Sequence, residues 1–178
     1  MEDSCRELKE RKVSPQISKW EITLLSFSQR AVDFGLRYLS SVLKEHGYDV
    51  KKLFLRKRLG EGVSLKVGEQ IYELAKDSLF VGFSLMTEDV VPAIKLAQIL
   101  KQLDKDLILV GGGVHPTVKP HDILDAFDFV VRGEAEQTIL KLAEEISMHK
   151  IIEDIKLPTV DSKYFKNDEI GVIEDIDT

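Results

Sequence analysis

The chain has 178 residues, of which 43% are hydrophobic, and its 25 Lys and Arg against 31 Asp and Glu give a net charge of −6. This composition is typical of one globular domain and excludes a disordered chain. The single cysteine, Cys5, excludes an intramolecular disulfide and any zinc or iron–sulfur site built only from thiolates of this chain. No apolar run is long enough for a membrane span, and the N-terminus lacks the apolar stretch of a signal peptide, so we expect a cytoplasmic protein. The acidic balance argues against nucleic acid as a partner.

Apolar runs alternate with amphipathic stretches along most of the chain. Residues 1–19 are rich in charge, and we expect an N-terminal arm there. Strands are then predicted at 22–27, 49–55, 79–83, 107–110 and 127–131, and helices at 34–46, 67–76, 89–103, 121–126 and 135–147. This order predicts an α/β domain over residues 20–149, with a Rossmann-like or flavodoxin-like three-layer fold and a five-stranded, mainly parallel sheet. Residues 150–178 lose the regularity, and we expect a C-terminal tail or a linker.

Loops that follow predicted strands carry unusual residues, and ligands of an open parallel sheet bind beyond the carboxyl ends of its strands. The fourth strand runs directly into Gly111, Gly112 and Gly113, and the absence of Cβ atoms there lets the backbone approach a bulky ligand. A plain tight turn before a helix is the alternative. The spacing matches neither the glycine motif of dinucleotide binding nor a P-loop, so phosphate binding by those motifs is not expected.

Polar residues follow the third and fifth strands. Ser84 and Thr87 place hydroxyl groups where a ligand would lie, although either one could instead cap the next helix. Gly133 and Glu134 suit a sharp turn into a helix whose N-terminus favours carboxylates, and a ligand contact is the other reading. Of the four histidines, only His115 stands in a ligand-facing loop, and no set of them has the spacing of a metal site. We therefore predict no metal ligands and assign no catalytic residue.

Five segments together resemble one known family. The stretches GLRYL (35–39), LKEHGYDV (43–50), VGFSLMT (81–87), VGGGVHPT (110–117) and DFVVRGEAE (128–136) are similar to cobalamin-binding domains. The resemblance is to those domains that precede the catalytic barrel of cobalamin-dependent radical S-adenosylmethionine enzymes, and it covers about residues 20–148. It implies a domain that holds the corrin over the carboxyl ends of the strands and threads the nucleotide tail between the sheet and the helices.

The resemblance also implies a set of cofactor-binding positions. Ser84 would meet the nucleotide tail, and Gly111 and Gly112 would let that tail pass the fourth strand. The loop after the first strand holds no histidine, so we expect the base of cobalamin to be displaced without a protein histidine from this loop in its place. The full predicted set is Ser28, Gln29, Arg30, Ser84, Leu85, Met86, Thr87, Gly111, Gly112, Gly113, His115, Pro116, Thr117, Gly133 and Glu134.

The sequence leaves two functional hypotheses open. The first is a cobalamin-binding module that serves a radical S-adenosylmethionine enzyme in methyl transfer or a related reaction. The iron–sulfur cluster and S-adenosylmethionine would then belong to a missing domain or a separate partner, because one cysteine cannot hold the cluster. The chain would not be a complete enzyme alone. The second hypothesis is a flavodoxin-like interaction or signalling domain that binds no tetrapyrrole.

Overall fold

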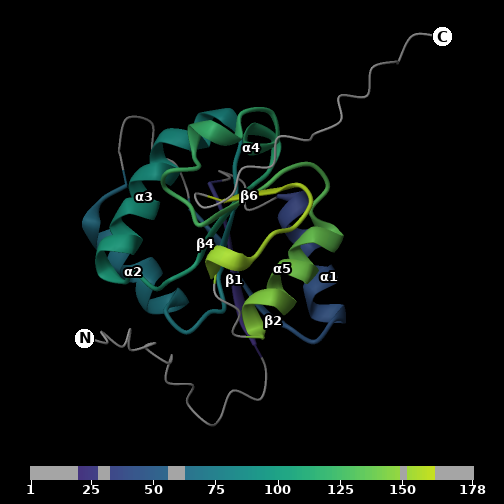
Figure 1. Cartoon of the computed structure of the whole chain (residues 1–178). Coiled ribbons are helices and arrows are strands. Elements are labelled where there is room, and N and C mark those ends of the chain that lie inside the picture. Colours follow the sequence, from purple (N-terminus) through teal and green to yellow (C-terminus); the bar gives the residue numbers. More distant parts are fainter. Residues whose placement is uncertain (1–19, 28–32, 56–62, 149–151, 163–178) are drawn as a thin grey trace, which may run out of the picture.

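The computed structural model describes residues 20–27, 33–55, 63–148 and 152–162 (Figure 1). These residues form a six-stranded sheet with the strand order β2-β1-β3-β4-β5-β6. The strands are β1 (Glu21–Ser26), β2 (Asp49–Phe54), β3 (Val81–Ser84), β4 (Leu109–Gly112), β5 (Phe129–Val131) and β6 (Val160–Ser162). The helices are α1 (Phe34–Glu45), α2 (Leu65–Ala75), α3 (Val90–Leu103), α4 (Val114–Val118) and α5 (Glu136–Ser147), and the 3₁₀ turns are η1 (Thr87–Asp89), η2 (Pro120–Asp122) and η3 (Ile152–Asp154). No described helix is long and apolar enough to cross a membrane.

The described sheet is parallel except at one edge. β1 to β5 pair in parallel, and β6 pairs antiparallel with β5, where Val131 lies opposite Val160. The predicted α/β fold with a mainly parallel sheet is therefore confirmed, but the predicted number of five strands is one too low. β6 lies inside the stretch that was expected to form a tail or linker. Its three residues, two of them polar, are too few to show the alternation that marks a strand.

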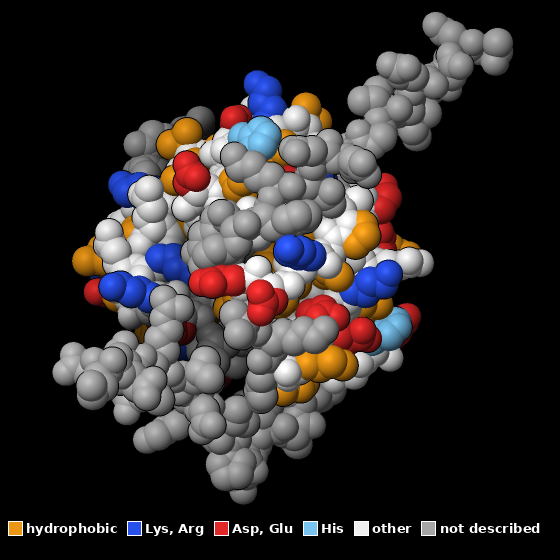
Figure 2. Space-filling view, viewed as in Figure 1, with side chains coloured by type: hydrophobic (Ala, Val, Ile, Leu, Met, Phe, Trp, Pro, Cys, Tyr) orange, Lys and Arg blue, Asp and Glu red, His pale blue; other side chains and the backbone are white. Residues whose placement is uncertain are grey.

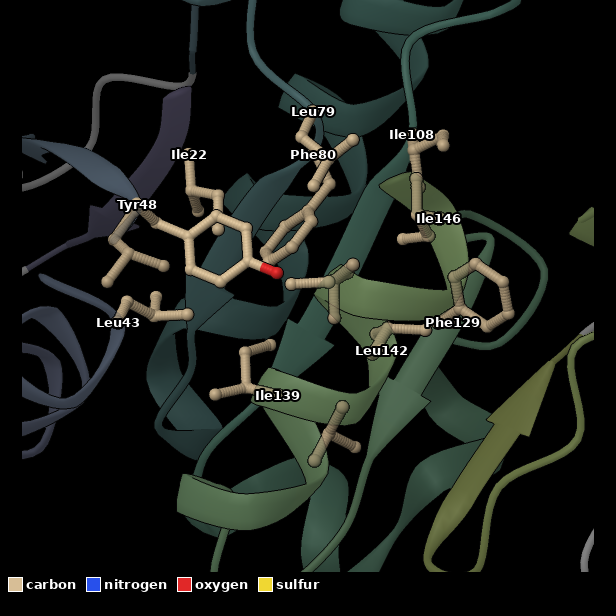
Figure 3. Close-up of a cluster of buried hydrophobic side chains, with 14 of the residues drawn as sticks. Ile22, Leu43, Tyr48, Leu79, Phe80, Ile108, Phe129, Ile139, Leu142 and Ile146 are labelled. Carbon is tan, nitrogen blue, oxygen red and sulfur yellow. The ribbon is translucent and has the colours of Figure 1, made fainter. Parts of the chain in front are cut away.

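Helices cover both faces of the sheet, as Figure 1 shows. α1 and α5 lie on one face, and α2 and α3 lie on the other. Because successive strand residues point to opposite faces, each face has an apolar cluster of its own. The cluster beneath α1 and α5 includes Ile22, Phe80, Phe129 and Leu142, whose side chains are drawn in Figure 3. This face also carries the candidate site.

Local sequence signals explain where α1 begins and ends. The Asp33 carboxylate accepts a backbone N–H of the first helical turn at 2.9 Å and the Ser26 hydroxyl at 2.8 Å. It therefore caps the helix and ties it to the end of β1. At the other end Gly47 adopts a φ of 91°, and the Tyr48 N–H donates to the Leu43 carbonyl, as in a Schellman motif. These two caps fix α1 over the sheet, where it forms one wall of the site.

One helix lies earlier than the sequence indicates. A helix was expected at 121–126, whereas α4 begins directly after Gly113 and is followed by η2. Pro116 falls in the first turn of α4, where its missing N–H breaks no helical hydrogen bond. The segment that was read as a glycine-rich loop is therefore partly helical. As a consequence, His115 and Thr117 project from a helix rather than from a loop.

Candidate ligand-binding site

A cavity of about 440 Å³ lies between the sheet and helices α1 and α5, at the carboxyl ends of β3, β4 and β5. Leu24, Val110 and Val131 line it from three strands, and Leu39 and Ile139 line it from the two helices. The volume falls in the range of small-molecule sites, roughly 300–1,000 Å³. The other lining residues are Gly35, Leu36, Gly82, Phe83, Ser84, Gly112, Gly113, Val114, Thr117, Val118, Gly133, Glu134, Ala135 and Glu136.

Small residues on two central strands create this space. Three positions on β3 and β4 face α1 and α5, because they alternate with residues of the opposite core. These positions are occupied by Gly82, Ser84 and Gly112. A Cβ added at Gly112 would lie 3.7 Å from its nearest neighbour, the Val131 carbonyl oxygen, which is an ordinary contact. Packing therefore does not require glycine at this position. A larger side chain there would instead occupy the cavity.

The other two glycines of the triplet serve the fold. A Cβ at Gly111 would come within 2.5 Å of the Ile123 Cδ1 atom on the opposite face of the sheet. Gly113 has a φ of 107°, and a Cβ there would lie 2.8 Å from the backbone N and O atoms of Leu85. The Leu85 N–H also donates to the Gly112 carbonyl at 2.8 Å, so this close approach of two chain segments requires glycine at 113.

Thr117 links two sides of the cavity. Its hydroxyl donates to the Gly113 carbonyl oxygen at 2.8 Å and accepts the Gly133 backbone N–H at 2.9 Å. These bonds connect the end of β4 to the turn that follows β5. Gly133 has a φ of 73°, which favours glycine, and a Cβ there would meet no described atom within 4 Å. The Thr117 hydroxyl therefore fixes the separation of two loops that border the cavity.

His115 lies outside the cavity lining. The imidazole is buried, with Nε2 3.1 Å from the Asp122 carboxylate and Nδ1 3.3 Å from the Thr87 hydroxyl. These contacts tie α4 to η1 and η2. The sequence predicts both His115 and Thr87 as cofactor-binding positions, whereas in the structure these two side chains contact each other.

A second cavity, of about 580 Å³, adjoins the first. Gly133, Glu134 and Glu136 line both cavities, so the turn after β5 borders two hollow regions. The remaining walls come from the residue that directly follows β5, from α1, from α5 and from the segment before β6. They are formed by Arg132, Tyr38, Gln137, Thr138, Lys141, Leu157, Pro158 and Thr159. Charged groups of both signs therefore surround this second space.

The predicted binding positions fall into three groups. The first cavity is lined by Ser84, Gly112, Gly113, Thr117, Gly133 and Glu134. Its lining does not include Leu85, Met86, Thr87, Gly111, His115 or Pro116. The described residues do not include Ser28, Gln29 or Arg30. The structure thus brings together one position at the end of β3, three around the end of β4 and two after β5.

Sequence reasoning misses the apolar walls of the cavity. Gly82 stands two residues before Ser84, so the alternation of a strand already places both on one face. In the same way, Leu36 and Leu39 share one side of α1 by helical periodicity. These patterns could have identified the walls, whereas nothing in the sequence indicates that Val114 and Val118 border the cavity from a short helix.

Charge does not mark the site. Figure 2 shows acidic and basic side chains intermixed on the face viewed in Figure 1. Within the described residues, no three His, Cys, Asp or Glu side chains gather as a metal site. The polar side chains of the cavity are the hydroxyls of Ser84 and Thr117 and the carboxylates of Glu134 and Glu136. The rest of the lining is apolar or glycine, which suits a ligand with a large uncharged part.

An open, mainly parallel α/β sheet with an apolar cavity at the carboxyl ends of its strands defines a class of ligand-binding domain. Residues 20–143 match the family model of the B12 binding domain, and the chain belongs to that family. The resemblance found in the sequence is thereby confirmed. The match covers β1 to β5 and most of α5, and it ends before β6.

Curated relatives support the same assignment. The anaerobic magnesium-protoporphyrin IX monomethyl ester cyclase of Synechocystis is 32% identical over 138 residues, which cover 76% of this chain and 26% of the cyclase. An uncharacterised methyltransferase of Pyrococcus horikoshii is 30% identical over 126 residues, which cover 68% of this chain and 26% of that protein. The chain thus spans about a quarter of the length of these relatives.

Solved structures share the fold. The cobalamin-dependent S-adenosylmethionine radical enzyme OxsB, with aqua-cobalamin bound, matches with a TM-score of 0.62 at 16% identity, over 82% of this chain and 21% of that one. A cobalamin-binding protein of Desulfitobacterium hafniense matches with a TM-score of 0.56 at 19% identity, over 73% of this chain and 60% of that one. At these identities the likeness concerns the fold alone.

Proposed function

We propose that the chain is a cobalamin-binding module, with the corrin over the carboxyl ends of the strands and the nucleotide tail in the cavity beneath α1 and α5. One observation carries the proposal: Gly112 leaves the cavity open although the backbone has room for a side chain. An apolar cavity that runs from the strand ends toward the core suits a flat ligand with a long tail. Family membership supplies the chemical class of that ligand.

The lining residues suggest how the chain would hold cobalamin. Ser84 carries a hydroxyl at the end of β3, where it would hydrogen-bond polar groups of the nucleotide tail. Leu24, Val110 and Val131 would exclude water around the buried part of the ligand. Glu134, in the turn after β5, would border the corrin. Bound cobalamin supplies a cobalt centre that can carry a methyl group or exchange electrons.

We further propose that cobalamin binds base-off, without a histidine from the loop after β1. That loop contains Ser28, Gln29 and Arg30 but no histidine, although these three residues lie outside the described part of the chain. His115 does not line the cavity, and both of its ring nitrogens lie within hydrogen-bond distance of protein groups, Asp122 and Thr87, which supports this form. A tail that enters the cavity would carry the base away from the cobalt.

A radical S-adenosylmethionine catalytic domain, in cis or in trans, would complete the chemistry. It would hold the iron–sulfur cluster and S-adenosylmethionine for methyl transfer or a related reaction. Relatives about four times as long as the matched region support this view. Phe34, Val114 and Val118 also expose apolar side chains near the carboxyl ends of the strands, and exposed apolar surface of this kind is typical of interaction sites.

The test is a titration of the full chain with hydroxocobalamin, followed by the visible absorption spectrum. We expect a one-to-one complex with the spectrum of the base-off form. Cobinamide, which has the corrin but no nucleotide tail, is the matched control ligand, and it should bind more weakly because it leaves the cavity unfilled. A folded protein that binds no cobalamin would overturn the proposal. Equal affinity for cobinamide would refute the location of the tail, and a base-on spectrum would refute the base-off form.

A further inference from the structure

The turn after β5 is bordered by hollow space on two sides. Gly133, Glu134 and Glu136 line both cavities, and a Cβ on Gly133 would meet no described atom within 4 Å. Side-chain packing around Gly133 therefore does little to hold the turn. Its position depends on the hydrogen bond from the Gly133 N–H to the Thr117 hydroxyl and on the contacts at the ends of the turn. Because the turn is a wall of the proposed cofactor cavity, the groups that hold its ends also shape that cavity.

Both ends of this turn are bonded to the segment that leads into β6. Before the turn, the backbone N–H of Arg132 donates to the Thr159 carbonyl oxygen at 2.8 Å. The side-chain Nε atom of Arg132 lies 3.0 Å from Oδ2 of Asp161. After the turn, the Thr138 hydroxyl in the first turn of α5 lies 3.3 Å from the Thr159 hydroxyl. The Arg132 and Asp161 side chains are only 9% and 4% exposed, so water and salt screen their attraction weakly.

We infer that Asp161 is a positioning residue of the cofactor site: acting through Arg132, it sets the place of the turn at 133–136 and thereby the affinity for cobalamin. Asp161 does not line the first cavity, so this effect is indirect. β6 lies beyond the residues that match the family. Because Asp161 belongs to β6, this inference extends the cofactor-binding unit of the chain as far as Ser162. The inference rests on the proposed function, because it concerns affinity for the same ligand.

The coupling has a second consequence at β6 itself. If the place of β6 changes the affinity for cobalamin, then cobalamin must change the stability of β6 by the same factor, because linkage between two equilibria is reciprocal. Bound cobalamin should therefore slow amide hydrogen exchange in Val160–Ser162, although β6 does not line the first cavity. Bound ligand also stabilises the fold as a whole, so the effect that separates this coupling from a purely structural role is slowing in β6 beyond the slowing in the distant edge strand β2.

A second ion pair at the other end of β5 supplies the control. Lys101 Nζ lies 2.6 Å from Oδ2 of Asp128, which directly precedes β5 and is buried. Neither residue is among those that line the two cavities. Asp161→Asn and Lys101→Met therefore each remove one charge from an ion pair beside β5. Only the first pair adjoins the turn at the proposed cofactor site.

The experiment compares the full chain with these two variants. The dissociation constant for hydroxocobalamin is measured by visible titration at a temperature at which circular dichroism shows all three proteins folded. In metal sites, loss of a group that orients a metal ligand typically weakens binding by a factor of about 10–100, and we take this range as the guide for a residue that positions the turn. We expect at least about a tenfold loss for Asp161→Asn, and less than about a twofold change for Lys101→Met. Hydrogen exchange in β6 and β2 of the unmodified chain is measured with and without cobalamin.

The outcomes separate this inference from the proposed function. An unmodified chain that binds no cobalamin overturns the proposed function, and the positioning role with it. An unmodified chain that binds, together with an Asp161→Asn variant that binds equally well, overturns the positioning role alone, as do equal losses in both variants. If Asp161→Asn does not fold, the unmodified chain decides, because exchange in β6 that cobalamin slows no more than exchange in β2 overturns the inference.

Discussion

The two faces of the sheet use small residues in opposite ways. Beneath α2 and α3, the rings of Phe83 and Phe127 pack edge to face at 5.0 Å, and Ile123 fills the space above Gly111. Beneath α1 and α5, the neighbouring Gly112 borders a cavity. The two glycines are adjacent in sequence, yet one admits a protein side chain and the other leaves room for a ligand. The role of each glycine is therefore set by the side chains around it and not by the glycine motif itself.

The largest expected effect follows from placing a large side chain at Gly112, the glycine that borders the cavity. Gly112→Leu should fill the cavity, because its Cβ meets only ordinary contacts and its longer chain then enters the space for the ligand. We expect cobalamin affinity to fall by roughly a hundredfold or more, about 2.7 kcal/mol. The unfolding free energy should change by less than about 1 kcal/mol, since the cavity accepts the added atoms. Visible titration and urea unfolding measure the two quantities.

Gly111→Leu is the matched control, and it should behave in the opposite way. Its side chain would collide with Ile123 in a filled core, so we expect a loss of stability of about 3 kcal/mol. The fraction that remains folded should bind cobalamin normally. If Gly112→Leu is instead the destabilised variant, or if it binds cobalamin as the unmodified chain does, the contrast between the two faces is incorrect.

The next prediction compares Gly113 with Gly133, two glycines that line the cavity. Both have positive φ, which costs a residue with a Cβ about 1–2 kcal/mol. Gly113→Ala adds a collision with the Leu85 backbone, so we expect a total loss of roughly 3 kcal/mol in unfolding free energy. Gly133→Ala meets open space among the described atoms, so only the loss of about 1–2 kcal/mol from the positive φ is expected.

Urea unfolding of the two alanine variants measures this difference. Ser41→Leu, at an exposed position of α1, controls for the effect of a substitution as such. Equal losses for Gly113→Ala and Gly133→Ala would show that the close approach of Leu85 does not constrain the start of α4.

The same contrast shows how far sequence reasoning reaches. Strands and helices with a clear period were located within about two residues, because alternation and helical spacing reflect burial directly. The two faces of β4 also follow from alternation alone. β6 was not predicted because its three residues are too few to show alternation, and its pairing with β5 joins residues that are distant in sequence, such as Val131 and Val160. The direction of His115 was not predictable either, since it depends on α4 beginning immediately after Gly113.

A smaller effect is expected at the link between the two loops of the rim. Thr117→Val keeps the shape of the side chain but removes the hydroxyl that bonds to Gly113 and Gly133. A hydrogen bond of this kind contributes about 1 kcal/mol. We therefore expect cobalamin affinity to fall by a factor of about 5–10, as measured by visible titration. Thr117→Ser retains the hydroxyl and should restore most of the affinity, so a Ser variant as weak as the Val variant would contradict a hydrogen-bonding role.

The smallest effect concerns the far end of the same face, where the core is filled rather than hollow. Tyr48 packs there against Leu43, and burial, aided by the negative charge of Glu144, raises the pKa of its phenol above the usual 10.0. A group whose pKa is higher in the folded state stabilises the fold below its unfolded pKa, and this contribution is lost as the pH rises through the folded pKa. The unfolding free energy should therefore decrease above about pH 10.

Tyr48→Phe removes the titrating group and should make this alkaline decrease smaller, as measured by urea unfolding between neutral pH and pH 11. Ser41→Leu, at an exposed position on α1 that carries no titratable group, is the control and should leave the decrease unchanged. Because Tyr48 does not line the cavity, its replacement should also leave cobalamin affinity at neutral pH unaltered. A loss of affinity in Tyr48→Phe would mean that the filled and hollow ends of this face are coupled, so the packing beneath α1 would itself contribute to ligand binding.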